Sequence, residues 1–156
     1  MENKLSVVGK SLRRVEALEK ACGETLFIDD MPLPECWLGG TVRADVPRGK
    51  IRAIRRDPDF DWESVVFADA GDIPGTNAVS MIRDDYPALA PGEISFPTQA
   101  VALIAAPDRQ TLMKALSSVS LDIEELPPVL DVEEAAEGRT VIWGSNNVMD
   151  EYHVSS

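Results

Sequence analysis

Apolar and polar positions follow two different periods along the chain, and together they predict a domain of helices and strands. The clearest helical signal is a set of apolar residues at i, i+3, i+4 and i+7, which would share one face: Leu112, Ala115, Leu116 and Val119. Asp108 stands where an aspartate caps a helix, so we predict the main helix over about 108–119. Residues 99–106 form the most apolar stretch, which is typical of a central strand.

Shorter apolar runs between turn residues predict further strands. They cover residues 25–28, 36–44, 50–56, 64–68, 76–82, 94–96 and 121–125. Short helical turns are expected over 14–20, with Gly23 as the C-terminal stop, and over 133–137. Pro127 must end the last strand, because proline has no N–H for a ladder. Strands thus interleave with one good helix, which predicts an α+β class and not a doubly wound α/β fold.

The charge balance limits the class of partner. The chain has 27 acidic residues against 15 basic ones, a formal net charge of −12. Phosphate backbones and anionic lipid surfaces repel such a chain, so we expect neither nucleic acid nor membrane as a partner. Its 156 residues, 44% of them hydrophobic, suit one domain with a core of its own.

The N-terminus and the cysteines both indicate a cytoplasmic location. The chain opens with polar residues, so we expect no secretory signal there, and no apolar run approaches the ~20 residues of a membrane helix. Cys22 and Cys36 do not form a C-x-x-C pair, and their usage fits two small buried side chains in a reducing compartment. Their spacing alone still leaves a disulfide open.

Two fragments of ligand-binding motifs are incomplete. Residues 9–11 resemble the end of a phosphate-binding loop, but Lys4 stands where that loop requires another glycine. The aspartates of residues 57–61 have the opening spacing of a calcium loop. Trp62 replaces its glycine and Ala68 replaces its bidentate acid. A flexible arm and a solvated turn are the better interpretations.

No complete set of catalytic residues is visible either. His153, the single histidine, is the fourth residue from the end of the printed sequence, where a general base is rarely held in place. Gln99 follows Pro97-Thr98 and opens an apolar strand, so its amide needs partners, which could be backbone groups or a ligand. We favour a structural role for Gln99. The sequence therefore predicts a piece of a larger enzyme with no active site of its own.

Six segments carry a family resemblance. They read GKSLRRVEALEKACG at 9–23, DDMPLP at 29–34, RA with Ile51 and Ile54 at 43–54, DIPG with Asn77 at 72–77, QAVALIAA at 99–106 and LPPVLDVEEA at 126–135. In this order they resemble the N-terminal α/β-hammerhead domain of molybdenum hydroxylase large subunits, of the xanthine dehydrogenase and aldehyde oxidase family. Thr98 departs by replacing a glycine, which could alter a tight turn. Cys22 replaces a threonine and Glu16 an aspartate.

The resemblance implies a division of the chain. An arm would cover 1–14, the hammerhead domain 15–137 with a mixed sheet, and a tail or linker toward molybdopterin-binding domains 138–156. No catalytic, cofactor-binding or metal-binding residue is carried over, because the family places its catalytic glutamate and molybdopterin contacts in later domains. Structural or interface roles are implied at four positions: Gly23, Asp30, Gln99 and Pro127.

The resemblance also implies a function. The chain would be a structural domain of an oxidoreductase and a scaffold for the molybdopterin-binding domains, with no activity expected in isolation. It would bind no cofactor itself, whereas molybdopterin, 2Fe-2S clusters and FAD would sit on the other domains or subunits, its partners. The alternative is a stand-alone protein-binding or assembly module with the same fold, whose partner would contact the apolar stretch 36–42.

Overall fold

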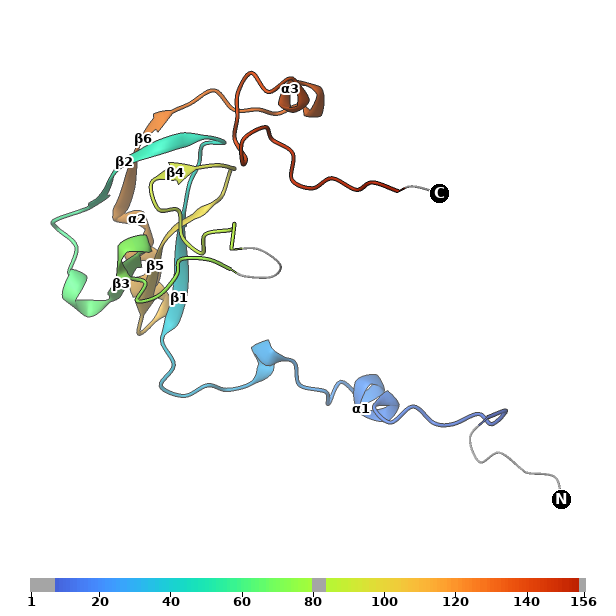
Figure 1. Cartoon of the computed structure of the whole chain (residues 1–156). Coiled ribbons are helices and arrows are strands. Elements are labelled where there is room, and N and C mark those ends of the chain that lie inside the picture. The colour runs from blue at the N-terminus through green and yellow to red at the C-terminus, as the bar shows by residue number, and fades with distance from the viewer. Residues whose placement is uncertain (1–7, 80–83, 155–156) are drawn as a thin grey trace. The chain divides into compact units, whose positions relative to one another are not determined.

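The computed structural model describes residues 8–79 and 84–154. The chain forms two compact units, Met1–Glu35 and Cys36–Ser156. The first unit contains one short α-helix, and the described strands all belong to the second (Figure 1). The boundaries at 14 and 137 that the resemblance implied stay a prediction.

Two three-stranded sheets form the framework of the second unit (Figure 1). The first has the order β1-β5-β3 and the second the order β4-β2-β6. The strands are β1 (Leu38–Arg43), β2 (Gly49–Arg56), β3 (Val66–Asp69), β4 (Glu93–Ile94), β5 (Ala100–Ala106) and β6 (Val119–Glu125). Their pairings are antiparallel. The α+β class is confirmed, with two antiparallel sheets in place of the single mixed sheet that we expected.

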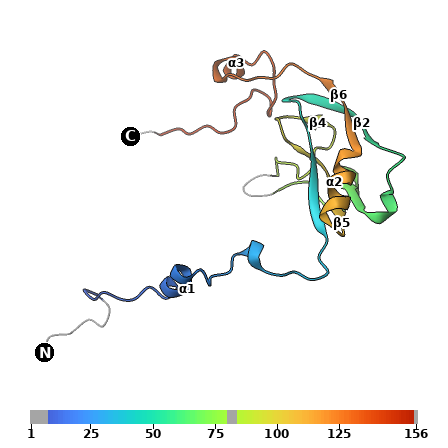
Figure 2. The same cartoon turned by 180° about the vertical axis from the view of Figure 1, so that it is seen from behind.

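Helix α2 (Arg109–Ser117) covers one face of the first sheet (Figure 2). Asp108 caps it as predicted, since its Oδ1 accepts the Thr111 N–H at 2.9 Å. The helix ends before the predicted limit, and Val119 opens β6. Helix and sheet share one core cluster, composed of Val42, Val65, Ala102, Ile104, Ala106, Leu112 and Ala115. The apolar face of α2 and the central strand β5 therefore pack together in one core.

A second core cluster joins the two sheets. It consists of buried Ala44, Ala90, Ile94 and Val101, with partly buried side chains of β2 and β6 packed on it. Gly49 lets β2 and β6 approach closely, because a Cβ there would meet the Ile123 Cγ2 and lie 2.9 Å from the Glu124 carbonyl oxygen. The alternation predicted over 50–56 corresponds to β2, whose arginines are all exposed.

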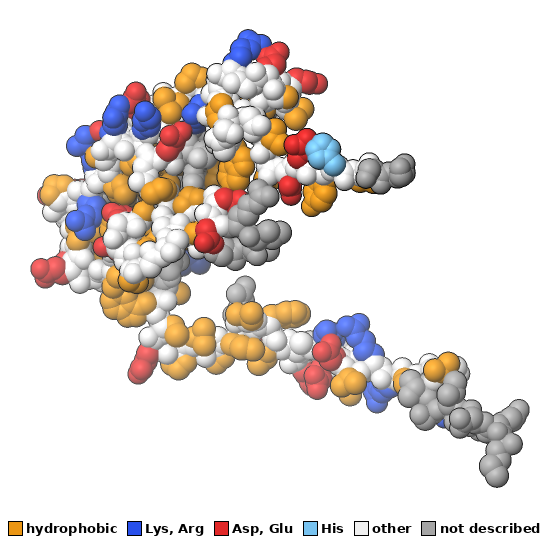
Figure 3. All heavy atoms as spheres, viewed as in Figure 1, with side chains coloured by type: hydrophobic (Ala, Val, Ile, Leu, Met, Phe, Trp, Pro, Cys, Tyr) orange, Lys and Arg blue, Asp and Glu red, His pale blue; other side chains and the backbone are white. Residues whose placement is uncertain are grey.

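The first unit is built from short local elements without buried apolar residues among those described. Helix α1 (Ala17–Cys22) ends at Gly23, whose φ of 73° is left-handed, as the predicted stop requires. Large apolar side chains are exposed along this unit (Figure 3): Val8, Leu12, Val15, Leu18, Leu26, Phe27, Ile28, Met31 and Leu33. Such a segment has no core of its own.

The strand predicted over 25–28 is wrong. These residues lead into a 3-10 helix, Ile28–Asp30, and the Asp30 Oδ2 accepts the Phe27 N–H at 3.0 Å. A carboxylate that captures the backbone N–H three residues earlier stabilises a turn and removes that donor from any ladder. Asp30 therefore has a local capping contact.

The strand predicted over 76–82 is wrong in its described part, and residues 80–83 lie outside the described residues. Asn77 explains the difference. Its Nδ2 donates to the Leu89 carbonyl at 2.7 Å, and its Oδ1 accepts the Leu89 N–H at 3.1 Å. The amide thus binds the backbone of a distant loop segment as a strand would, without forming a ladder.

Candidate functional site

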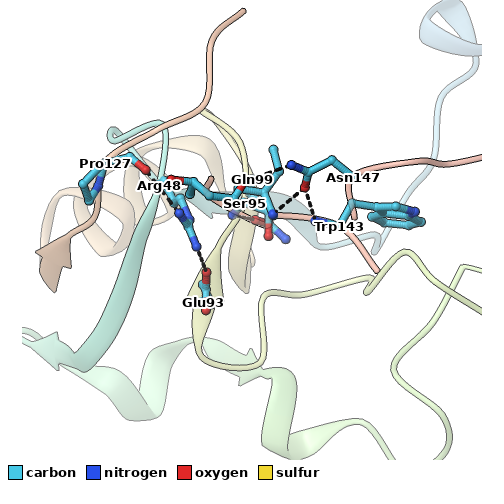
Figure 4. Close-up of polar contacts among 9 residues, drawn as sticks. Arg48, Glu93, Ser95, Gln99, Pro127, Trp143 and Asn147 are labelled. Atoms are coloured by element: carbon cyan, nitrogen blue, oxygen red, sulfur yellow. Dashed lines mark hydrogen bonds and ion pairs between the residues drawn. The ribbon is translucent and has the colours of Figure 1, made fainter. Parts of the chain in front are cut away.

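The turn from β4 to β5 connects the two sheets, and Gln99 closes it. The Gln99 side chain is 3% exposed, and its Oε1 accepts the Ser95 N–H at 2.8 Å (Figure 4). Its backbone carbonyl accepts the Ala44 N–H at 3.0 Å. The amide oxygen therefore binds a backbone group, which is one of the two partners that the sequence left open. The structural role of Gln99 stays a prediction.

Thr98 adopts a backbone conformation that is unfavourable for its residue type. Its φ is 66°, in the left-handed region that β-branched residues rarely occupy. Two contacts hold it there: its N–H donates to the Ala44 carbonyl at 3.0 Å, and its carbonyl accepts from the Arg43 Nη1 at 2.9 Å. The position where the resemblance expects glycine is therefore one where glycine is physically favoured.

Arg48 precedes β2 and connects it by hydrogen bonds to β4 and to the segment that follows β6. Its Nη1 donates to the Pro127 carbonyl at 3.2 Å, and its Nη2 donates to the Glu93 Oε1 at 3.3 Å (Figure 4). The Arg48 carbonyl in turn accepts the Leu126 N–H at 3.1 Å. The Arg48 side chain is 15% exposed, so these bonds are partly shielded from water.

The four positions singled out in the sequence make separate local contacts. Gly23 and Asp30 belong to the first unit, and each ends or caps a short local helix. In the second unit, Gln99 bonds with Ser95 and Ala44, whereas Pro127 contributes its carbonyl to Arg48. All four contacts join parts of the chain to each other. Their assignment as structural or interface residues stays a prediction.

Asn147 is a structural residue that sequence reasoning missed. Its Nδ2 donates to the carbonyls of Ala135 and Thr140 at 2.9 and 2.8 Å. Its Oδ1 accepts the N–H groups of Ile142 and Trp143 at 2.7 and 3.2 Å (Figure 4). This one side chain ties helix α3 (Val132–Glu137) to the chain that follows. The only available signal in the sequence was the residue type in a loop three residues after Gly144. The φ of Asn147 is 63°, a backbone conformation that asparagine tolerates.

The charged residues that the sequence offered as metal ligands or bases make local hydrogen bonds and ion pairs. In the 57–61 loop, Asp57 accepts the Asp59 N–H at 3.0 Å and Asp61 accepts the Glu63 N–H at 3.2 Å. Among the described residues there is no cluster of three metal-binding side chains. His153 is exposed and contacts Glu151 at 3.1 Å. No metal-binding or catalytic cluster is therefore seen in the described part of the chain.

The perturbed carboxyl groups are helix caps. The Thr111 backbone N–H, followed by its hydroxyl, lowers the pKa of Asp108 below its usual range. The backbone N–H of Glu134, with further contacts from Glu133, lowers the pKa of Asp131 in the same way at the start of α3. Both shifts favour an ionised cap, which is a stabilising role and not that of a general base.

The hollow at the end of α2 has a volume of about 650 Å³ and contains two arginines, Arg55 and Arg56. Both cations already have partners. Arg55 pairs with Asp122, and the Arg56 guanidinium lies over the rings of Trp62 and Phe67 at 5.5 and 5.2 Å.

Cys22 and Cys36 are free thiols, and both are exposed, so the burial that we expected for them is wrong. In the described part of the chain, no helix is long and apolar enough to cross a membrane.

Comparison with known proteins shows which protein family this chain resembles. Residues 22–127 match the family model described as "Aldehyde oxidase and xanthine dehydrogenase, a/b hammerhead domain". A xanthine dehydrogenase of Blastobotrys adeninivorans is 33% identical over 141 residues, covering 86% of this chain and 10% of the relative. The nicotinate dehydrogenase large molybdopterin subunit of Eubacterium barkeri is 28% identical over 150 residues, covering 95% of this chain and 35% of that subunit.

A solved structure agrees with these relatives. Reconstituted CO dehydrogenase from Oligotropha carboxidovorans has a TM-score of 0.74 and 27% identity, over 84% of this chain and 17% of that chain. The α/β-hammerhead fold expected from the six sequence segments is thereby confirmed. The chain spans 10% and 35% of the length of the two curated relatives above.

Proposed function

Because the chain belongs to the aldehyde oxidase and xanthine dehydrogenase a/b hammerhead domain family, we propose that it acts as a scaffold for the molybdopterin-binding domains of a molybdenum hydroxylase. The observation that carries this proposal is the family match over residues 22–127, together with relatives of which the chain covers only a fraction. The reaction then belongs to the complete enzyme, and this chain supplies shape and not chemistry.

The use of the polar side chains supports a scaffold role. Arg48, Asn77 and Gln99 each bond to the backbone of a distant or turning segment. Asn147 does the same for the chain after α3. Such amide and guanidinium groups hydrogen-bond to backbone N–H and carbonyl groups that would otherwise need water as a partner. These bonds hold the loops in fixed positions. A domain built this way presents a defined surface to its neighbours.

The complete enzyme supplies the cofactors in this proposal. Molybdopterin, 2Fe-2S clusters and FAD are held by other domains or subunits, and these are the partners of this chain. The name of the Eubacterium barkeri relative, a large molybdopterin subunit, supports the molybdopterin part of this assignment. The oxidoreductase names of the other relatives support a redox reaction. The cytoplasm is the proposed location.

An absorption spectrum of the purified chain tests the scaffold role. The expected spectrum has no band above about 300 nm, because the protein itself absorbs through aromatic side chains alone and no cofactor copurifies. Molybdenum analysis of the same sample is expected to give no stoichiometric metal. A stoichiometric flavin, iron–sulfur or molybdopterin signal on the isolated chain would contradict the scaffold role.

A further inference from the structure

The first sheet has two faces of different character. Alternation along β5 directs Ala102, Ile104 and Ala106 into the core under α2, where each is at most 1% exposed. Leu103 and Ala105 lie between them and point to the opposite face. On that face Leu103 is 45% exposed, although it lies in the central strand of the sheet. Val101 lies on the same face but is buried in the second core cluster. The sheet is thus covered by α2 on one side and open on the other only around Leu103 and Ala105.

The strand register places small and apolar neighbours beside these two residues. Leu103 stands opposite Thr41 on β1 and Ala68 on β3, and Ala105 stands opposite Gly39 and Val66. We call this surface the Leu103 face; it consists of Gly39, Thr41, Val66, Ala68, Leu103 and Ala105. A shallow hollow of about 320 Å³ follows it, lined by these residues and by Gly40 and Ile104.

The Leu103 face differs from the rest of the surface in charge. Of all residues in the chain, 27% are charged, but none of the six that form this face is. On the second sheet, by contrast, cross-strand ion pairs connect β2 with β6, namely Arg52 with Glu124 and Arg55 with Asp122. The second sheet therefore presents a surface suited to water, whereas an open apolar sheet face is typical of an interaction site.

We propose that the Leu103 face is the surface on which the molybdopterin-binding part of the enzyme packs, through a segment that presents aliphatic side chains. This inference rests on the proposed scaffold function. Two observations select this occupant. In the relatives, 90% and 65% of the chain lies outside the matched part, so a large polypeptide adjoins the domain. The floor of Gly39 and Ala68 leaves room for close approach, and the absence of charge suits apolar side chains better than a polar peptide.

Cysteine footprinting tests this assignment. Leu103→Cys is introduced into a Cys22→Ser, Cys36→Ser background, and its reaction with N-ethylmaleimide is followed by mass spectrometry. The matched control is Met113→Cys, which replaces a 57% exposed side chain on α2 and leaves the Leu103 face unchanged. Rates are compared between the isolated chain and the enzyme in which this chain is assembled with its molybdopterin-binding polypeptide.

Assembly is expected to slow labelling at position 103 by about tenfold or more, because the core of an interface excludes water and solutes, while labelling at position 113 changes by less than about twofold. Equal rates at position 103 before and after assembly would overturn the inference. So would protection in the isolated monomeric chain. Protection that rises with the concentration of the isolated chain would assign the face to a second copy instead.

The failure of this inference can be told apart from failure of the scaffold function. Light scattering first establishes whether the unmodified chain and the molybdopterin-binding polypeptide form a complex. If no complex forms, the scaffold function is contradicted, and the inference falls with it. If a complex forms and position 103 stays reactive, the scaffold function stands and the interface lies elsewhere.

Discussion

Arg43 donates from its Nη1 to the carbonyl oxygen of Thr98 at 2.9 Å, and this bond ties the end of β1 to the one turn that connects β4 with β5. The Ala44 carbonyl holds the N–H of the same threonine at 3.0 Å. Thr98 is thereby kept at a φ of 66°, although its branched side chain disfavours that conformation. The contacts around the turn outweigh the local preference of the residue.

Thr98→Gly is expected to stabilise the domain for this reason. Glycine adopts a positive φ without strain, and the gain exceeds its greater chain entropy in the unfolded state, giving about 0.5–1 kcal/mol in the free energy of unfolding. Urea denaturation followed by circular dichroism measures the change. Thr98→Ala is the control, with a smaller gain because it relieves only the branching. A loss of stability in Thr98→Gly would show that the turn is not strained.

Gln99→Leu is expected to destabilise the same turn. The substitution keeps the volume but leaves the Ser95 N–H without its acceptor at 2.8 Å, which costs about 1–3 kcal/mol in a partly buried setting. The control is Gln110→Leu on the exposed side of α2, where no comparable loss is expected. Thermal unfolding compares the two variants. Equal midpoints would mean that the Gln99 amide contributes nothing to the connection between the sheets.

Two glycines allow a matched test of close packing. Gly49→Ala would place a Cβ against Ile123 and the Glu124 carbonyl, and we expect a loss of about 2 kcal/mol or more because backbone atoms must move. At Gly39 the same substitution meets no atom within 4 Å, so stability should change by less than about 0.5 kcal/mol. Chemical denaturation of both variants checks the contrast. Similar losses in both would contradict the close approach of β2 and β6.

The Asp108 cap gives the stability of α2 a dependence on pH. The Thr111 N–H lowers the pKa of Asp108 in the folded chain, so the ionised carboxylate favours folding. This contribution is present above the ordinary aspartate pKa of about 4 and is lost as the pH falls through the lower folded value. Asp108→Asn keeps a capping oxygen but does not titrate. Its thermal midpoint should therefore fall less between pH 7 and pH 3 than that of the unmodified chain, and an equal fall would contradict this role.

Local sequence patterns predicted the elements that are stabilised by periodic burial. The apolar run at 99–106 became the central strand β5, and the i, i+3, i+4 pattern with Asp108 became α2. Both signals repeat over several residues, so one exception does not remove them. The resemblance to the hammerhead family then supplied the arrangement, which periodicity does not contain.

Contacts made by single side chains were not predictable in this way. Asn77 captures the Leu89 backbone 12 residues away, and Asn147 collects four backbone bonds, yet each is one asparagine in a polar loop. The pairing of the strands could not be predicted for a similar reason. Alternation indicates which side of a strand is buried but not which strand lies beside it, so it could not correct the mixed sheet that the resemblance implied, where two antiparallel sheets occur.

The most direct test of the central claim is the mass and molybdenum content of the complex formed when this chain is produced together with the molybdopterin-binding part of the enzyme, supplied as a separate polypeptide. Light scattering on a sizing column gives the mass, and metal analysis of the same fractions gives the molybdenum. The scaffold account predicts a one-to-one complex that contains molybdenum and an isolated chain that contains none. A chain that elutes alone while the polypeptide is fully assembled and active without it would contradict the account.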